Sequence, residues 1–325
     1  MQIEHQKINL EAPWPANTLQ KLTVVPILID FEDPLSKADV VPIQGDLTFQ
    51  KTETLLGPGV FDLWNDFLSS EDRKRLNAVT HALVHRFSGN LGSDKEDEKS
   101  KSFMQHVFGC LRLIKPTRKS FQYVQAYVQQ ERVEVYGLSH PPAIELPLMP
   151  VTQTLNRVTL ADLQVLSTLL PKFMLISQPN GPVYLQRAIR FYEDGYSATS
   201  DSALQLISWV IGLEAIFSKG EKILEETQLV ELLKKRFGKI DIKQPQWRSY
   251  FQRSPALTIA NEAEHLIELR NCLIHASRIP QELRAPHVDH LGQSHELAKY
   301  LHAGAAMALQ AAILEEFDTI DLASV

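Results

Sequence analysis

The sequence predicts an α+β protein, in which a mixed α/β region is followed by an all-helical carboxy-terminal bundle. Segments rich in β-branched or alternating residues occur in the first half, and apolar residues at helical spacing dominate the second. A proline-rich segment at 138–150 separates the two patterns. Because 325 residues suit two domains of ordinary size, we expect a mixed domain of unknown role at 1–145 and a helical domain at 151–325.

β-strands are expected at three places in the amino-terminal half. Leu22 to Phe31 and Val40 to Phe49 carry the residue types that favour strands, although prolines interrupt both segments. Phe121 to Tyr136 alternates apolar and polar residues, as a half-buried pair of strands does.

The rest of this half is predicted to be helix and loop. A long amphipathic helix is expected from Phe61 to Phe87, and a short helix around Phe103 to Ile114. Between them, the mixed charges of Ser88 to Lys101 are typical of a solvated loop.

Beyond Pro150 the pattern predicts helices and no strand. The expected helices share apolar residues that recur every three or four positions. They span Leu160 to Ile176, Val183 to Tyr192, Ala203 to Phe217, Thr227 to Phe237, Thr258 to Ala276 and Ser294 to Phe317.

Composition excludes several classes of protein. With only two cysteines, Cys110 and Cys272, the chain has neither a disulfide framework nor a cysteine-based zinc site. The start of the chain lacks a signal-peptide pattern and no apolar run reaches membrane-spanning length, so a cytoplasmic protein without membrane contact is expected. The formal net charge of −6 means that any nucleic acid must meet a local basic patch.

The helix expected at 258–276 has an apolar and a polar side. At about 100° per residue, its apolar residues form one arc. This arc consists of Leu266, Ile267, Leu269, Leu273 and Ile274. The opposite side carries Glu264, Glu268, Asn271 and His275. Since Asn271 and His275 are four residues apart, they are expected to be neighbours on the helix surface.

Two charged residues do not fit their apolar surroundings. Arg270 lies within the apolar arc, and Glu214 lies in the most apolar of the expected helices. An isolated charge in such a setting is costly, whereas two opposite charges can compensate each other. We therefore predict that these two helices pack together and that Glu214 and Arg270 form an ion pair.

The string from Arg270 to His275 (RNCLIH) resembles the motif of the HEPN superfamily, which consists of an arginine, a polar residue, three variable residues and a histidine. Leu213 to Phe217 (LEAIF), followed later by Glu268 to Asn271 (ELRN), is similar to the ApeA-like branch of that superfamily. The resemblance covers about 183–317. It departs from the branch at Ala276, where glycine often follows the histidine.

By this resemblance, the carboxy-terminal domain is a HEPN-type bundle and an endoribonuclease that needs no metal or cofactor. His275 is then the catalytic histidine, Arg270 the motif arginine, Asn271 the polar residue beside it and Glu214 a supporting acid. Such enzymes work as homodimers that join two motifs, cut transfer RNA or messenger RNA, and serve in toxin–antitoxin or antiphage defence. An antitoxin or a regulatory protein is a further partner that the resemblance implies.

The residue types fit this chemistry. Cleavage of RNA through its 2′-hydroxyl needs a base and an acid near neutral pH, which histidine can provide, and cationic donors to phosphate, which arginine provides. Four alternatives stay open. One is a non-catalytic HEPN module that binds or dimerises, and another is an unrelated helical bundle. In the third, the ion pair is purely structural and His275 is an ordinary surface histidine. In the fourth, Arg270 is structural and His275 is catalytic.

A basic stretch is the best candidate for contact with RNA. Its cations are Lys234, Lys235, Arg236, Lys239, Lys243 and Arg248. Trp247, Tyr250 and Phe251 are interleaved with the later ones, and rings beside cations are typical of surfaces that bind RNA. The alternative is a solvated helix end whose aromatic residues pack inward.

Histidines offer two further candidates. His287 and His290 could share a helical face with metal-binding spacing, in a region that also holds His295 and His302, but an exposed helix surface is favoured. His81 and His85 are four apart on the expected helix at 61–87. Ala82 stands where a zinc protease needs its glutamate, so that interpretation fails and no metal site is expected.

Overall fold

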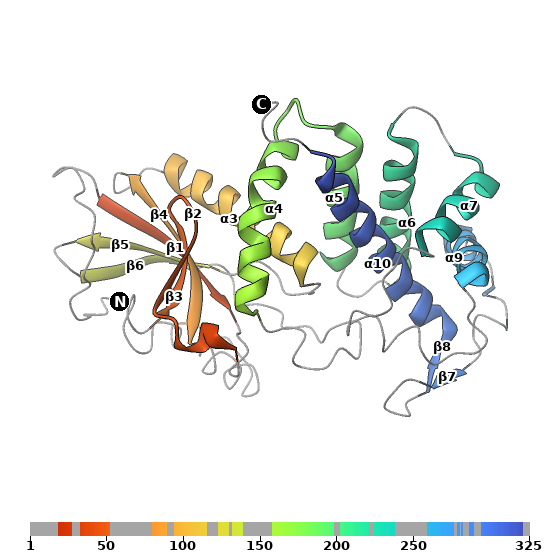
Figure 1. The fold of residues 1–325 in the computed structure, drawn as a ribbon, viewed down its shortest axis with the longest axis horizontal. Helices are drawn as coiled ribbons and strands as arrows, with labels where there is room; N and C mark the ends of the chain where they lie inside the picture. The colour runs from red at the N-terminus through yellow and green to blue at the C-terminus, as the bar shows by residue number, and fades with distance from the viewer. Residues whose placement is uncertain are drawn as a thin grey trace. The chain divides into compact units, whose positions relative to one another are not determined.

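The chain combines helices with antiparallel strands and is mostly helical, which confirms the α+β class (Figure 1). The computed structural model describes the following residues: 19–27, 33–52, 80–89, 94–115, 123–129, 132–138, 158–197, 202–220, 224–237, 259–275, 278–279, 281, 286–288 and 294–320. Two compact units divide the chain, one of 1–146 with 152–171 and one of 147–151 with 172–325. This division gives 152–171 to the first unit, whereas the sequence pattern placed the start of the second domain at 151.

The first unit contains a six-stranded antiparallel sheet. Its strands are β1 (Leu19–Ile27), β2 (Val40–Gln44), β3 (Leu47–Lys51), β4 (His81–Gly89), β5 (Val124–Gln129) and β6 (Arg132–Leu138). Their order across the sheet is β2-β3-β4-β1-β5-β6, so β1 and β4 lie in its interior. All three β predictions are confirmed over the described residues, while 28–31, 121–122 and 130–131 lie outside them. The segment at 40–49 lies in the β2–β3 hairpin, whose turn places Gly45 at φ +52°. A short 3₁₀ helix, η1 (Pro34–Lys37), precedes β2.

The helix predicted from Phe61 to Phe87 is wrong over its last seven residues. Residues 81–87 belong to β4, and 53–79 lie outside the described residues. β4 lies between β3 and β1, and four consecutive residues of it, His81 to Val84, are buried, so both of its faces are covered there. A strand buried on both faces loses the apolar–polar alternation that identifies a strand in a sequence.

The loop predicted at 88–101 is wrong over 88–89 and 94–101, and 90–93 lie outside the described residues. Residues 88–89 end β4, and helix α3 (Asp94–Ile114) begins at Asp94 and is twenty-one residues long. Acidic side chains in the first turns favour a helix start, because they complement the partial positive charge of the helix dipole. Residues three or four apart on α3 turn inward. These are Asp97, Ser100, Met104, Val107 and Leu111.

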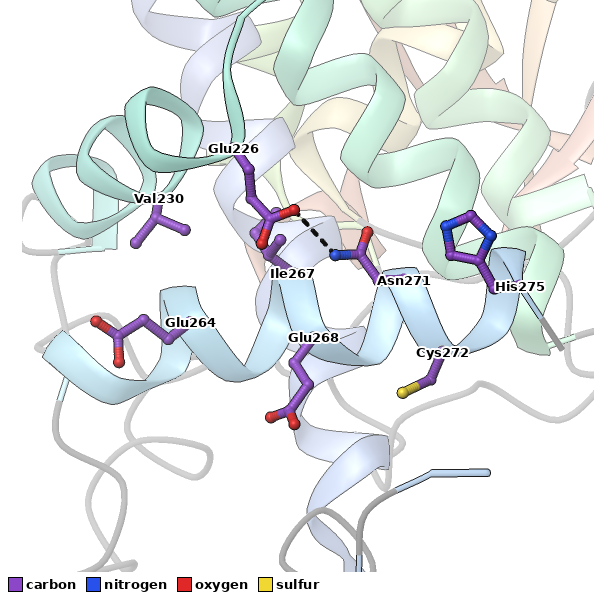
Figure 2. Close-up of a pocket in the computed structure, with 8 residues that line it drawn as sticks. All are labelled: Glu226, Val230, Glu264, Ile267, Glu268, Asn271, Cys272 and His275. Carbon is purple, nitrogen blue, oxygen red and sulfur yellow. Dashed lines mark hydrogen bonds between the residues drawn. The ribbon is translucent and has the colours of Figure 1, made fainter. Parts of the chain in front are cut away.

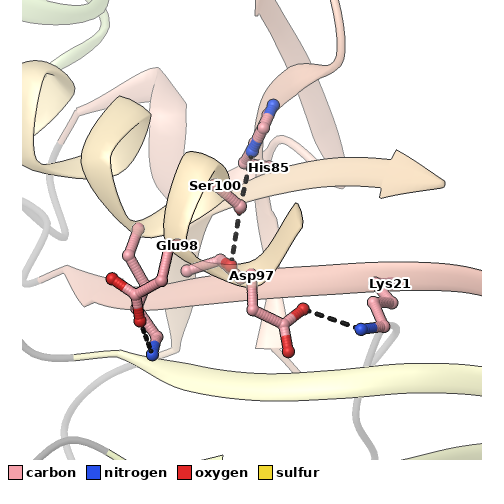
Figure 3. Close-up of polar contacts among 7 residues, drawn as sticks. Lys21, His85, Asp97, Glu98 and Ser100 are labelled. Atoms are coloured by element: carbon pink, nitrogen blue, oxygen red, sulfur yellow. Dashed lines mark hydrogen bonds and ion pairs between the residues drawn. The ribbon is translucent and has the colours of Figure 1, made fainter. Parts of the chain in front are cut away.

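A buried polar layer joins α3 to β1 and β4 (Figure 3). The Lys21 ammonium, on a residue only 1% exposed, donates to the Asp97 carboxylate at 2.8 Å. The Ser100 hydroxyl lies 2.8 Å from the Thr23 hydroxyl and 2.8 Å from Nδ1 of His85. Burial lowers the pKa of His85. Asp97 and Ser100 are therefore part of the interior, whereas Lys95, Glu98 and Lys99 on the same helix are exposed.

Helices form most of the second unit. They are α5 (Val183–Ser197), α6 (Ser202–Ser218), α7 (Glu226–Phe237), α9 (Ile259–Ile274) and α10 (Leu297–Asp318). Helix α4 (Leu160–Ile176) contains the division between the units, at Pro171. All six helices predicted beyond residue 150 are confirmed, with bounds within a few residues except at the end of α5.

The prediction that no strand follows residue 150 is wrong. A small hairpin of β7 (Pro286–Val288) and β8 (Ser294–Glu296) precedes α10. His287 lies in β7 opposite His295 in β8, so the helical face proposed for His287 and His290 does not exist. His290 lies outside the described residues.

Helix α6 lies at the centre of the second unit and packs against α5 and α10 (Figure 1). It is apolar on most of its circumference, as expected for a helix enclosed by neighbours, and Trp209, Val210 and Leu213 are buried. A β-carbon on Gly212 would approach Leu309 of α10 to 2.5 Å. Glycine is therefore required there for the two helices to lie this close.

Candidate active site

The predicted ion pair between α9 and α6 is confirmed. Nη2 of Arg270 donates to Oε1 of Glu214 at 2.7 Å. The side chains are 21% and 31% exposed, respectively, so the pair is partly shielded from water rather than enclosed. The inference from two misfitting charges therefore located a real contact between residues that are far apart in the sequence.

Burial along α9 explains why Arg270 is only half-buried. Leu266, Ile267 and Leu269 are buried, but Leu273 is half-buried and Ile274 is 46% exposed. The apolar arc predicted from the sequence is thus covered in its first part and opens to solvent towards the end of the helix. Arg270 lies where this change occurs.

Asn271 connects the arginine to a third helix. Its side-chain Oδ1 accepts a hydrogen bond from Nη1 of Arg270 at 3.1 Å, and its Nδ2 donates to Oε2 of Glu226 at 3.1 Å (Figure 2). Glu226 is in the first turn of α7. This contact could not be predicted from the sequence, because nothing in a helical pattern indicates which face of α7 meets α9. Arg270 is thereby held by residues of α6 and α9, and Asn271 by a residue of α7.

His275 follows the last residue of α9 and is exposed. Its backbone N–H donates to the carbonyl of Asn271 at 3.0 Å, which continues the helical pattern by one residue. The ring therefore lies one turn beyond Asn271, as predicted, and its exposure leaves it accessible to a substrate.

A groove between α7 and α9 is lined by Asn271 and His275, whereas Arg270 and Glu214 do not line it (Figure 2). It has a volume of about 310 Å³ and is lined by Glu226, Val230, Glu264, Ile267, Glu268, Asn271, Cys272 and His275. The four polar residues predicted to share one side of α9 all line it. Its three glutamates make the groove acidic, which the sequence pattern did not predict.

Two cations of the basic stretch form ion pairs with acidic residues. Lys234 forms ion pairs with Glu231 at 3.1 Å and with Glu264 at 2.9 Å, and Arg236 forms one with Glu315. The hydrogen bond to Glu264 raises the pKa of Lys234 and lowers that of Glu264.

Lys235, between the two paired cations, is exposed. The other predicted RNA-binding residues lie outside the described residues. These are Lys239, Lys243 and Arg248, together with the interleaved Trp247, Tyr250 and Phe251. Contact of this stretch with RNA stays a prediction.

His81 and His85 both lie on β4, not on a helix. Four residues along a strand separate their α-carbons by about 13 Å, which prevents them from sharing one metal ion. Nδ1 of His81 lies 2.9 Å from the Thr80 hydroxyl and its Nε2 lies 3.2 Å from the Ala38 carbonyl, so the fold uses both ring nitrogens.

Within the part of the chain that the structure describes, no three histidine, cysteine or acidic side chains are arranged to hold a metal. Both cysteines are free thiols, Cys110 buried and Cys272 half-buried. None of the helices seen over the same residues has both the length and the apolar character needed to cross a bilayer.

Comparison with known proteins does not assign the chain to a family: no family model matches it, and neither the curated proteins nor the solved structures give a significant match.

Proposed function

We propose that the chain is a metal-independent endoribonuclease of the HEPN type, whose active site is formed by Arg270, Asn271 and His275. One observation carries the proposal. Arg270 is tied to Glu214 at 2.7 Å and to Asn271 at 3.1 Å, and Asn271 lines a surface groove together with the exposed His275, which lies one helical turn further along. The resemblance of 270–275 to the HEPN motif supports the same assignment.

In the proposed reaction, a general base removes the proton of an RNA 2′-hydroxyl, whose oxygen then attacks the adjacent phosphorus. The bond from phosphorus to the 5′-oxygen breaks, and a general acid protonates that oxygen. The products are a 2′,3′-cyclic phosphate and a 5′-hydroxyl. His275 acts as base or acid, and the guanidinium of Arg270 donates to the phosphate as charge builds on its oxygens.

A homodimer completes this scheme. One histidine cannot easily act as both base and acid in a single step, so we propose that His275 of a second copy supplies the other group. Light scattering of the purified chain, with and without RNA, should then give the mass of two copies. A monomer under both conditions would count against the paired-histidine scheme.

The decisive experiment is cleavage of labelled total RNA in EDTA. His275→Gln should lower the rate by about a hundredfold or more, the usual effect of losing a general acid or base. His265→Gln is the matched control, because His265 is on the same helix but does not line the groove. Full activity of His275→Gln would refute the assignment to this motif.

A second candidate function, a module that binds another protein without catalysis, is favoured by the acidic groove. Glu226, Glu264 and Glu268 suit a partner that presents lysine or arginine side chains. A wild-type chain that leaves every RNA intact in EDTA, yet binds a lysine-rich peptide with an affinity that falls as salt rises, would replace the ribonuclease assignment with this one.

A further inference from the structure

The Asn271 amide lies between a group that can only donate hydrogen bonds and a group that can only accept them. A guanidinium has no acceptor and a carboxylate has no hydrogen to donate, whereas an amide offers one of each. Asn271 directs its oxygen to Arg270 and its nitrogen to Glu226, at 3.1 Å in both cases. Only this orientation of the amide satisfies both neighbours, so the two contacts depend on each other.

Glu226 therefore helps to keep the amide oxygen of Asn271 against the guanidinium of Arg270. Without the carboxylate, nothing holds the amide nitrogen, so the Asn271 side chain could rotate away from the guanidinium, which would remove the contact to Nη1. Glu214 would then hold only Nη2. We propose that Glu226 is a positioning residue for Arg270, acting through Asn271.

The orientation of the guanidinium determines which of its hydrogens can reach a phosphate. Nε of Arg270 is buried and lacks a hydrogen-bond partner among the described residues. Nη1 and Nη2 each carry two hydrogens, and one on each is used by Asn271 and Glu214. The second hydrogen on each nitrogen remains for the paired donation to phosphate that a planar guanidinium provides. This catalytic consequence rests on the proposed ribonuclease function; the positioning itself does not.

Three variants test the role of Glu226. Glu226→Ala removes the acceptor, and Glu226→Gln removes the charge but keeps an oxygen that Asn271 can donate to. Glu225→Ala removes the same charge from the neighbouring exposed position, which does not line the groove. Because the hydrogen bond from Asn271 to Glu226 is exposed, all three variants should fold and melt within a few degrees of the wild type.

The first measurement is the rotation rate of the Arg270 guanidinium about its Nε–Cζ bond, from ¹⁵N NMR of the full chain. Glu226→Ala should raise this rate about fivefold, the factor that corresponds to one hydrogen bond of ordinary net strength. Glu226→Gln and Glu225→Ala should rotate at the wild-type rate. An unchanged rate in Glu226→Ala, or an equal rise in Glu226→Gln, overturns the proposal.

The second measurement is RNA cleavage, which separates this proposal from the proposed function. Glu226→Ala should lower kcat by a factor similar to the change in rotation and leave KM nearly unchanged. If the wild type cuts no RNA but Glu226→Ala still frees the guanidinium, the ribonuclease assignment fails and the positioning role stands. If the wild type cuts RNA and Glu226→Ala changes neither rotation nor kcat, the positioning role fails and the ribonuclease assignment stands.

Discussion

Replacing Arg270 with alanine removes the cation that compensates Glu214 on the most apolar helix of the second unit. The substitution also removes the donor to Asn271. The carboxylate that is left behind can recover only part of its hydration, because about two thirds of the Glu214 side chain is covered by protein. Folding stability and catalysis should therefore decrease together in this variant.

The solvent exposure of the Arg270–Glu214 ion pair determines how much folding stability its loss should cost. Breaking a fully buried ion pair costs about 3–5 kcal/mol, and an exposed pair contributes about 0–1 kcal/mol. With side chains 21% and 31% exposed, the Arg270–Glu214 pair falls between these limits. We expect a loss of about 1–3 kcal/mol, which lowers Tm by about 2–4 °C per kcal/mol in a unit of this size.

The assay is a set of thermal melts that forms a double-mutant cycle. Arg270→Ala and Glu214→Ala should each destabilise, and the double variant should lose less than the sum of the two. Glu214→Gln should be milder, because the amide oxygen can still accept from Nη2. His275→Gln, at an exposed position, should melt like the wild type. A coupling energy of zero between Arg270 and Glu214 would refute the reasoning.

Three further outcomes are expected in the first unit and the groove. Lys21→Met should cost about 3–5 kcal/mol in urea unfolding because it breaks a largely buried ion pair by removing one partner, and adding Asp97→Leu should recover part of that loss. Burial raises the pKa of the Cys110 thiol, so mass spectrometry after iodoacetamide treatment at pH 8 should find Cys272 alkylated first. Burial lowers the pKa of His85 in the folded chain. As the pH falls, the imidazole therefore binds a proton in the unfolded state before it does so in the folded state. The free energy of unfolding should keep its full value above about pH 6.5 and decrease below it. His85→Gln should reduce this decrease in melts between about pH 5 and 7.5.

The helices of the second unit could be predicted because their signal is local. Each buries one stripe or most of its surface against neighbours, so apolar residues recur at the helical period whatever the partner is. The signal failed at 81–87, because consecutive residues at the start of β4 are buried on both faces and so do not alternate between apolar and polar. It failed at 94–101 as well, because Asp97 and Ser100 are polar residues that pack against a polar sheet face.

The candidate site was predictable where a residue conflicted with its own surroundings. Arg270 and Glu214 each lie among apolar residues, where an isolated charge is costly, and pairing the two opposite charges was the simplest way to compensate both. Glu226 carried no such conflict, since an acid in the first turn of a helix is ordinary. Its contact with Asn271 depends on how α7 meets α9, which the periodicity of either helix does not determine.

Replacing Glu268 should change ligand affinity in opposite directions under the two candidate functions. Of the three glutamates in the groove, Glu264 is paired with Lys234 and Glu226 accepts from Asn271, whereas Glu268 forms no ion pair with the residues described. It precedes His275 by seven residues, or about 10 Å along the helix. At that distance a like charge weakens phosphate binding only about twofold at low salt and is largely screened at physiological salt.

Removing the charge with Glu268→Gln should therefore tighten RNA binding slightly at low salt, and the gain should disappear at 0.15 M salt if the groove serves RNA cleavage. If the groove instead binds the cationic side chains of a protein, the same substitution should weaken binding of a lysine-rich peptide. Titrations of wild type and Glu268→Gln with both ligands, at two salt concentrations, decide between the two. A variant that binds RNA less tightly than the wild type would contradict the proposal that phosphate approaches His275 along this side of α9.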